Sequence, residues 1–235
     1  MTALYRDQPF NDGFDDINRV EVGVPLGAFH TIKFTGVDPE TGNAQYLDAD
    51  GDGIITSSDR VIVGSPHPTY FGGLTNSLTF KRFDLRAFVQ FTQGNEVYNG
   101  MRAYADDAGY NLDNKFRNAL NRWREPGDIT NEPRASYDGT SDAWFTSSRF
   151  VEDGSYARLQ EVTLGYRLPE AIGRRTNLGE SRIYVSGRNL KTWTDYAGFN
   201  PDANSSGSST NISLGTDFYS YPLARTFTFG ISGSF

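Results

Sequence analysis

Apolar and polar residues alternate along several stretches of the chain. Residues 83–92 place their apolar side chains at every second position, and only Lys81 and Arg82 separate them from a second alternating stretch that ends at Phe80. Alternation of this kind predicts β-strands with one apolar face, and the two-residue gap predicts a tight hairpin. Extended character recurs in six stretches, which are therefore the expected strands: 26–37, 69–81, 82–92, 148–168, 181–192 and 221–235.

The last of these stretches has an unusual polar face. One face carries Phe227, Phe229 and Ile231, whereas the other carries small neutral residues such as Thr226 and Thr228. A sheet of a water-soluble sandwich would expose charged residues on its outer face. Small neutral side chains instead suit the water-facing wall of a wide barrel, and runs of about 9–13 residues suit strands that cross a membrane at a tilt.

The connections between the expected strands alternate in length. Short turns contrast with long loops near 38–68, 93–147 and 193–221, a pattern typical of outer-membrane barrels. Six strands are too few to close a barrel, since about eight are needed, and open strand edges are not tolerated in lipid. We therefore expect an all-β chain that is one part of an antiparallel transmembrane β-barrel. Within the long loops, the spacing of apolar residues predicts one short helix at 111–124.

Composition removes several classes of function. The formal net charge of −7 argues against a nucleic-acid partner, and the absence of Cys excludes disulfides and thiolate chemistry. No apolar run is long enough for a membrane-spanning helix, and no signal peptide is apparent at the N-terminus. Neighbouring carboxylates such as Asp106 and Asp107 would point to opposite faces of a strand and could not flank one bond, so we expect no enzyme.

An acidic loop at 48–59 carries the sharpest chemical motif. Carboxylates stand at loop positions 1, 3, 5 and 12 and Gly53 at position 6, the spacing with which a twelve-residue loop wraps around Ca²⁺. Position 12 is an Asp, which is shorter than the usual Glu. The alternative to a calcium site is a solvated acidic turn, in which the Gly and Asp residues serve backbone geometry only. The expected structural calcium ligands are Asp48, Asp50, Asp52, the Ile54 carbonyl, Thr56 and Asp59.

Beyond this loop, the order and spacing of many segments resemble the C-terminal part of the SusC/RagA family of TonB-dependent outer-membrane transporters. The resemblance covers nearly the whole chain from about residue 20. It is carried by Val22–Phe29, Gly36–Pro39, Asp48–Pro66, Phe80–Leu85, Gln93–Asn99, Val151–Leu159, Ser186–Leu190, Tyr196–Pro201, Tyr221–Thr226 and the terminal Phe235.

The resemblance implies a 22-stranded barrel in the outer membrane of a Gram-negative cell, closed by a plug. It implies import of oligosaccharides or peptides, with a SusD/RagB-like surface lipoprotein and a TonB complex as partners and membrane lipids around the barrel. Residues 1–25 would be a periplasmic turn or the remainder of a preceding strand, and residues 26–235 would form about six C-terminal strands with long extracellular loops. Because the plug and the TonB box lie outside this sequence, we expect no transport by these residues alone.

Aromatic residues in the long loops are candidates for contact with the substrate. Ring faces stack on sugars, although packing within loops or an aromatic girdle at the membrane interface is the better explanation for any single one of them. The candidates are Tyr104, Tyr110, Trp123, Trp144 and Trp193. The alternative for the whole chain is a secreted, calcium-stabilised β-rich module that binds glycans.

Overall fold

The computed structural model describes residues 8–143, 146–172, 179–204 and 212–233, and the chain forms two compact units. The first, here called the loop unit, comprises Met1–His67, Asn95–Asp153 and Tyr196–Tyr221. The second, the sheet unit, comprises Pro68–Gly94, Gly154–Asp195 and Pro222–Phe235. The loop unit thus corresponds closely to the expected long loops. Among the described residues, no helix has the length and apolar character needed to cross a membrane.

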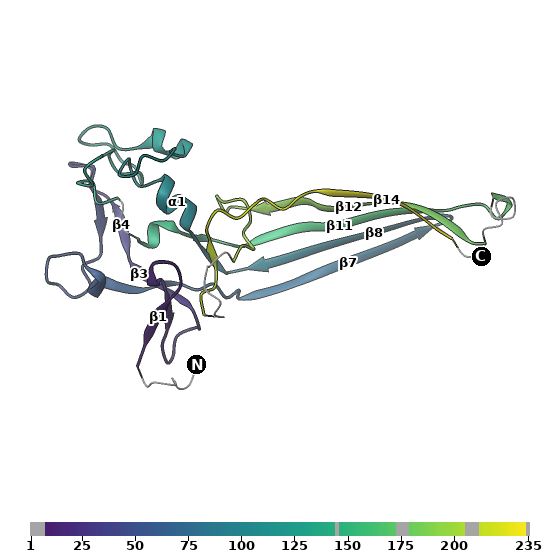
Figure 1. Ribbon diagram of the computed structural model, residues 1–235, viewed down its shortest axis with the longest axis horizontal. Coiled ribbons are helices and arrows are strands. Elements are labelled where there is room, and N and C mark those ends of the chain that lie inside the picture. The colour runs from purple at the N-terminus through teal and green to yellow at the C-terminus, as the bar shows by residue number, and fades with distance from the viewer. Residues whose placement is uncertain (1–7, 144–145, 173–178, 205–211, 234–235) are drawn as a thin grey trace. The chain divides into compact units, whose positions relative to one another are not determined.

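The sheet unit is one antiparallel sheet of five strands in the order β14-β12-β11-β8-β7, seen in Figure 1 as the long ribbons that run side by side. Sequential strands pair with each other, so the sheet is a meander. The predicted hairpin is confirmed, with Lys81 at a φ of 54° in its turn. The strands are β7 (Tyr70–Phe80), β8 (Phe83–Gln93), β11 (Tyr156–Arg167), β12 (Ser181–Thr194) and β14 (Thr226–Gly233).

The pairing register places apolar residues of all five strands on one face. Leu78 pairs with Leu85, which pairs with Leu164, and Val185 pairs with Phe229. This face is exposed, with Leu74 at 67% and Phe229 at 81% of full accessibility. The apolar face contains Leu74, Leu78, Phe80, Phe83, Leu85, Val89, Phe91, Val162, Leu164, Tyr166, Ile183, Val185, Phe227, Phe229 and Ile231.

The opposite face of the sheet is polar and is braced by charge pairs. Arg182 of β12 reaches across β11 to Asp84 of β8, with Nε–Oδ1 at 2.9 Å and Nη2–Oδ2 at 2.5 Å. A Cβ atom at Gly165, on the intervening strand, would overlap this guanidinium. Because Gly165 has no side chain, Arg182 of β12 can contact Asp84 of β8 although β11 lies between these two strands.

Short strands and 3₁₀ turns make up the loop unit around a core of Ile17, Phe29, Tyr98 and Phe150. The first of its three sheets contains β1 (Phe10–Asp12), β2 (Asn18–Val20), β3 (Ala28–Ile32) and β6 (Arg60–Gly64). The second sheet pairs β4 (Phe34–Val37) with β5 (Ala44–Tyr46). The third sheet contains β10 (Val151–Asp153), β9 (Glu96–Asn99) and β13 (Thr216–Asp217). The helices are α1 (Gly100–Ala105) and the 3₁₀ turns η1 (Phe14–Asp16), η2 (Ser57–Asp59), η3 (Arg117–Asn121) and η4 (Ser148–Phe150).

Two expected strands are wrong in extent. The stretch 26–37 forms β3 and β4, which belong to different sheets of the loop unit, and 148–168 is divided between β10 and β11. The sheet unit therefore has five strands among the described residues, not the expected six. β3 is buried on both of its faces within the loop unit, so it is not a strand with one face exposed to a membrane.

The predicted helix at 111–124 is also wrong, because only η3 forms there. Leu112 and Leu120 are 87% and 60% exposed, so the apparent apolar stripe is not buried and provides no packing energy for a helix. The boundary expected after residue 25 does not separate the two units, since β2 pairs with β3 across it.

Candidate metal loop and substrate pocket

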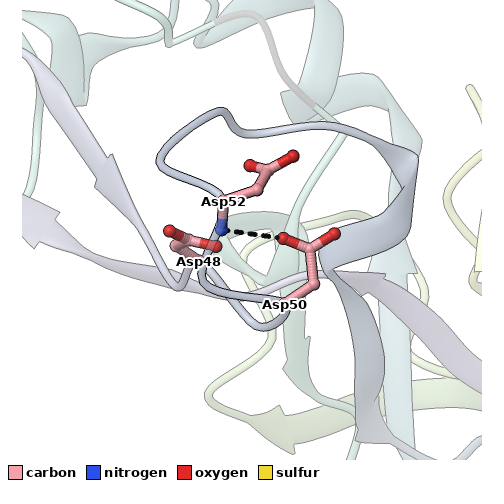
Figure 2. A group of neighbouring side chains, drawn as sticks. All are labelled: Asp48, Asp50 and Asp52. Carbon is pink, nitrogen blue, oxygen red and sulfur yellow. Dashed lines mark hydrogen bonds between the residues drawn. The ribbon is translucent and has the colours of Figure 1, made fainter.

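The acidic loop brings three of its predicted ligands together. Asp48, Asp50 and Asp52 each offer a carboxylate oxygen, and these oxygens lie within 4.8 Å of one another. Figure 2 shows the three side chains on one loop, with the hydrogen bond from the Asp52 amide to Asp50 at 3.2 Å. Asp48 also accepts hydrogen bonds from the amides of Gly51 and Gly53 at 2.7 and 2.9 Å. The backbone of the loop thus wraps around the carboxylate of Asp48.

Glycine is required at two positions of this turn. Gly51 and Gly53 have φ angles of 80° and 82°, in the left-handed region that other residues seldom adopt. No atom lies within 4 Å of a Cβ built at either position, so the backbone conformation, and not crowding, explains the glycines. The sequence pattern correctly identified Gly53 as the residue that permits the sharp turn.

Asp59 has a different role from the other three carboxylates in this structure. Its side chain is buried and accepts hydrogen bonds from the amides of Ala49 at 2.7 Å and Thr56 at 2.8 Å, which closes the loop. The N–H groups of Thr56 and Ala49 lower the pKa of Asp59 below its ordinary value. The Thr56 hydroxyl accepts from the Ser58 amide and caps η2, while Ile54 is exposed. The donor set of hard carboxylate oxygens fits Ca²⁺.

A pocket of about 560 Å³ lies within the loop unit, beside the C-terminal end of this acidic loop. Two predicted substrate-contact residues line it together: Tyr104, from α1, and Tyr110, from the segment after that helix. The other lining residues come from η1, β3, the start of η2, β6, α1, the segment 107–111 and the segment before η4. They are Phe14, Asp15, Ile32, Thr56, Ser57, Arg60, Ala103, Asp107, Asn111 and Thr146.

Asp107 fixes the polypeptide on one side of the pocket. This buried carboxylate pairs with Lys115 and accepts hydrogen bonds from the amides of Gly109 at 3.0 Å and Asn111 at 2.7 Å. These bonds define the turn that carries Tyr110. Because Lys115 compensates the charge of Asp107, the pocket does not contain an isolated buried anion there.

A second ionic cluster holds α1 in place. Arg102 bonds to Asp106 at 2.6 Å and to Glu152 of β10 at 2.8 Å, and Arg149 bonds to Glu132 at 2.5 Å. Burial lowers the pKa of Arg102, but its hydrogen bonds to Glu152 and Asp106 outweigh this effect and raise the pKa overall. The neighbouring carboxylates considered as candidate catalytic groups are thus partners of structural cations.

The remaining predicted substrate contacts lie elsewhere. Trp123 packs on Gly42, and its indole N–H donates to the carbonyl of Pro39 at 2.9 Å, which makes it part of loop packing. Trp193 lies in β12 on the apolar face of the sheet unit, opposite Ala157. Trp144 and Phe235 lie outside the described residues. The sequence analysis did not identify Phe14, Asp15 or Arg60 as candidate site residues. For Arg60, the position directly after the acidic loop was a possible signal; for Phe14 and Asp15 there was none.

Comparison with known proteins finds relatives of this chain. The TonB-dependent receptor P3 of Formosa agariphila is 34% identical over 231 residues, which cover 91% of this chain and 22% of that protein. The TonB-dependent receptor SusC of Bacteroides thetaiotaomicron is 25% identical over 92% of this chain and 20% of its own length. Over nearly its whole length, the chain is similar to one part of the TonB-dependent receptors of the SusC type. The resemblance inferred from the sequence segments is therefore confirmed.

A solved structure shows the same similarity. The structure of the RagAB peptide transporter superposes with a TM-score of 0.76 at 25% identity, covering 100% of this chain and 26% of that one. The all-β class predicted from the sequence is likewise confirmed. No protein-family model matches the chain. The chain spans about a fifth of the length of the curated relatives it matches.

Proposed function

We propose that this chain is part of an outer-membrane TonB-dependent transporter that imports oligosaccharides or peptides into the periplasm. The observation that supports this most directly is the sheet unit, whose five long strands expose an apolar face from end to end. A water-soluble protein rarely leaves so large an apolar surface uncovered. Lipid tails cover such a face without cost, and water in the barrel lumen solvates the polar face.

In this proposal, residues 26–235 contribute C-terminal strands and extracellular loops of a 22-stranded barrel. The edges of the sheet at β7 and β14 would pair with further strands of the same receptor, because lipid cannot satisfy free backbone groups. Residues 8–25 would lie with the extracellular loops, since β2 pairs with β3 in the loop unit. Transport is then a property of the whole receptor, including its plug and TonB box, and not of this segment alone.

The loop unit would contact the cargo and a SusD/RagB-like surface lipoprotein. The pocket lined by Tyr104 and Tyr110 supports this role, because its 560 Å³ lies in the range of small-molecule sites and aromatic rings stack on apolar faces of sugars and peptides. The relative with a solved structure is described as a peptide transporter, so peptides and oligosaccharides both belong in the tests.

We also propose that the loop at 48–59 binds a structural Ca²⁺ ion. Asp48, Asp50 and Asp52 would supply carboxylate oxygens. The loop spacing predicts the Ile54 carbonyl, Thr56 and Asp59 as the remaining ligands, and Asp59 would exchange its amide hydrogen bonds for the ion. Bound calcium would remove the repulsion among the three neighbouring carboxylates. An affinity of roughly 10⁻⁴–10⁻³ M is typical of extracellular structural sites.

Single cysteines test the membrane orientation of the sheet, because the chain has no Cys of its own. In the whole receptor, with any cysteine elsewhere replaced, Leu164→Cys and Thr163→Cys place a label on opposite faces of β11. A fluorophore at position 164 should be quenched by lipids with a quencher on their tails, and one at position 163 should not. Equal quenching at both positions would contradict the proposed orientation.

Uptake by cells tests the transport itself. Deletion of the receptor gene should abolish uptake of a labelled oligosaccharide or of a labelled oligopeptide, and restoring the gene should recover it. Outer-membrane location and a heat-modifiable gel mobility provide the accompanying checks. A receptor found outside the outer membrane would refute the proposal.

Calcium binding is tested by limited proteolysis of the loop in the whole receptor. Calcium should slow cleavage within residues 48–59, and the double variant Asp50→Asn/Asp52→Asn should lose this protection. Asp38→Asn is the matched control, because Asp38 caps another exposed turn of the same unit. Equal cleavage rates with calcium and with chelator would rule out the site.

A further inference from the structure

Arg60 has an incompletely satisfied side chain in the wall of the pocket. It begins β6, directly after the acidic loop, and its Nη1 donates to the carbonyl of Asp16 at 3.1 Å. Its Nε is buried without a hydrogen-bond partner, and no carboxylate of the described residues forms an ion pair with it. A guanidinium normally uses both edges of its planar fork, so this one has unused capacity for an anion.

The positive charge of Arg60 acts on a neighbouring group. Burial lowers the pKa of His30, and the charges of Arg19 and Arg60 lower it further. Arg19 is compensated by Glu21 at 3.0 Å, whereas Arg60 has no such partner among the described residues. Among the described residues that line the pocket, Arg60 is therefore the only cation, and no carboxylate pairs with it.

Apolar rings surround this charge. Phe14 and Tyr104 both line the pocket, with their ring centroids 6.3 Å apart in an edge-to-face arrangement. Behind them Tyr98 is fully buried, and its hydroxyl has no hydrogen-bond partner. The Tyr98 ring, 5.9 Å from that of Phe14, thus packs behind the aromatic wall of the pocket.

We infer that this pocket binds a carboxylate-bearing residue of the cargo, with Arg60 as the anion anchor and the rings of Phe14, Tyr104 and Tyr110 as the apolar wall. The inference rests on the proposed transport function and narrows its substrate class. The carboxylate belongs either to a uronic acid of an oligosaccharide or to an acidic side chain of a peptide. Of the two carboxylates that line the pocket, Asp107 is paired with Lys115, and Asp15 is exposed and forms no ion pair with Arg60.

Matched pairs of probes separate charge recognition from general binding. The sugar pair is tetragalacturonate and its fully methyl-esterified form, and the peptide pair is a hexapeptide with two Glu residues and the same peptide with Gln. Each is titrated calorimetrically into the whole purified receptor. At least one acidic probe should bind at least tenfold more tightly than its neutral counterpart, and the pair that discriminates identifies the source of the carboxylate.

Substitution of the anchor tests the residue itself. Arg60→Gln should weaken binding of the acidic probe by about ten- to a hundredfold and leave the neutral probe unchanged, because charge-assisted hydrogen bonds are lost. Arg60→Lys should retain part of the preference. Arg19→Gln is the matched control, since Arg19 lies on another strand of the same sheet, is paired with Glu21 and does not line the pocket.

Three outcomes would overturn the inference: no preference for either acidic probe, an equal loss for acidic and neutral probes in Arg60→Gln, or the same loss in Arg19→Gln. Heat-modifiable mobility of each variant shows whether it is folded. If uptake of a neutral oligosaccharide persists while the acidic preference is absent, the transport proposal stands and only this inference fails. If the receptor is not in the outer membrane, the transport proposal fails instead.

Discussion

Replacing Gly165 with Ala should destabilise the sheet unit, because the new methyl group would disturb the ion pair between Arg182 and Asp84. The added Cβ would overlap the guanidinium of Arg182, which crosses above Gly165 to reach Asp84. The side chains of Arg182 and Asp84 are 30% and 23% exposed, so the pair itself contributes about 1 kcal/mol after allowance for solvent. Forcing an extra methyl into a filled space adds about 1–3 kcal/mol.

The sign of this effect should reverse when the arginine is absent. In an Arg182→Ala background the space above residue 165 is free, and Ala is favoured over Gly within a strand by about 0.5–1 kcal/mol. The double-mutant cycle should therefore give a coupling energy of at least about 1.5 kcal/mol. Unfolding of the whole receptor by urea in lipid vesicles, followed by heat-modifiable mobility, measures each variant. An equal cost of Gly165→Ala in both backgrounds, within about 0.5 kcal/mol, would refute this reasoning.

Three further predictions follow from other parts of the chain. On β14, Phe229→Lys should destabilise the receptor in vesicles by about 2–4 kcal/mol, whereas the adjacent Thr228→Lys should cost less than about 1 kcal/mol; equal costs would contradict a lipid-facing apolar surface. Trp123→Ala should make residues 39–42 more susceptible to protease, since it removes a ring packed on Gly42 and a bond to Pro39, while Leu120→Ala, at an exposed position nearby, should not. Hydrogen bonds from Ser136 and Thr140 lower the pKa of Asp138 to about 2. Because the folded pKa lies below the unfolded value of 3.8, this stabilisation is present above pH 4 and is lost as the pH falls toward 2; Asp138→Asn should remove that pH dependence in an NMR titration of the loop.

Local patterns in the sequence predicted the long strands well. In β8, every second side chain faces the apolar surface, and a short window of residues suffices to recognise such alternation. The loop unit lacks this regularity. β3 is buried on both sides, and the apolar residues at 112 and 120 face solvent, so neither the strand at 26–37 nor the helix at 111–124 could be judged correctly from periodicity.

The two candidate sites differ in the same way. The acidic loop is contiguous, so its carboxylates and Gly53 could be recognised from spacing alone. The pocket is assembled from η1, from the end of the acidic loop and from α1, which are far apart in the sequence. Tyr104 and Tyr110 were identified as aromatic residues in a long loop, but the position of Arg60 beside them depends on tertiary packing that no local pattern encodes.

The way the longest loop leaves the sheet has a consequence for how such receptors diversify. The chain departs after β8 and returns at the start of β11, where Thr92 and Tyr156 are paired directly across the two strands. The ends of the intervening segment, residues 95–153, are therefore held at neighbouring positions whatever lies between them. Doubling the length of such a segment adds only about 0.6 kcal/mol of closure entropy. Insertions, deletions and whole-loop exchanges can thus accumulate there without shifting the register of the sheet, which lets one sheet acquire new binding surfaces.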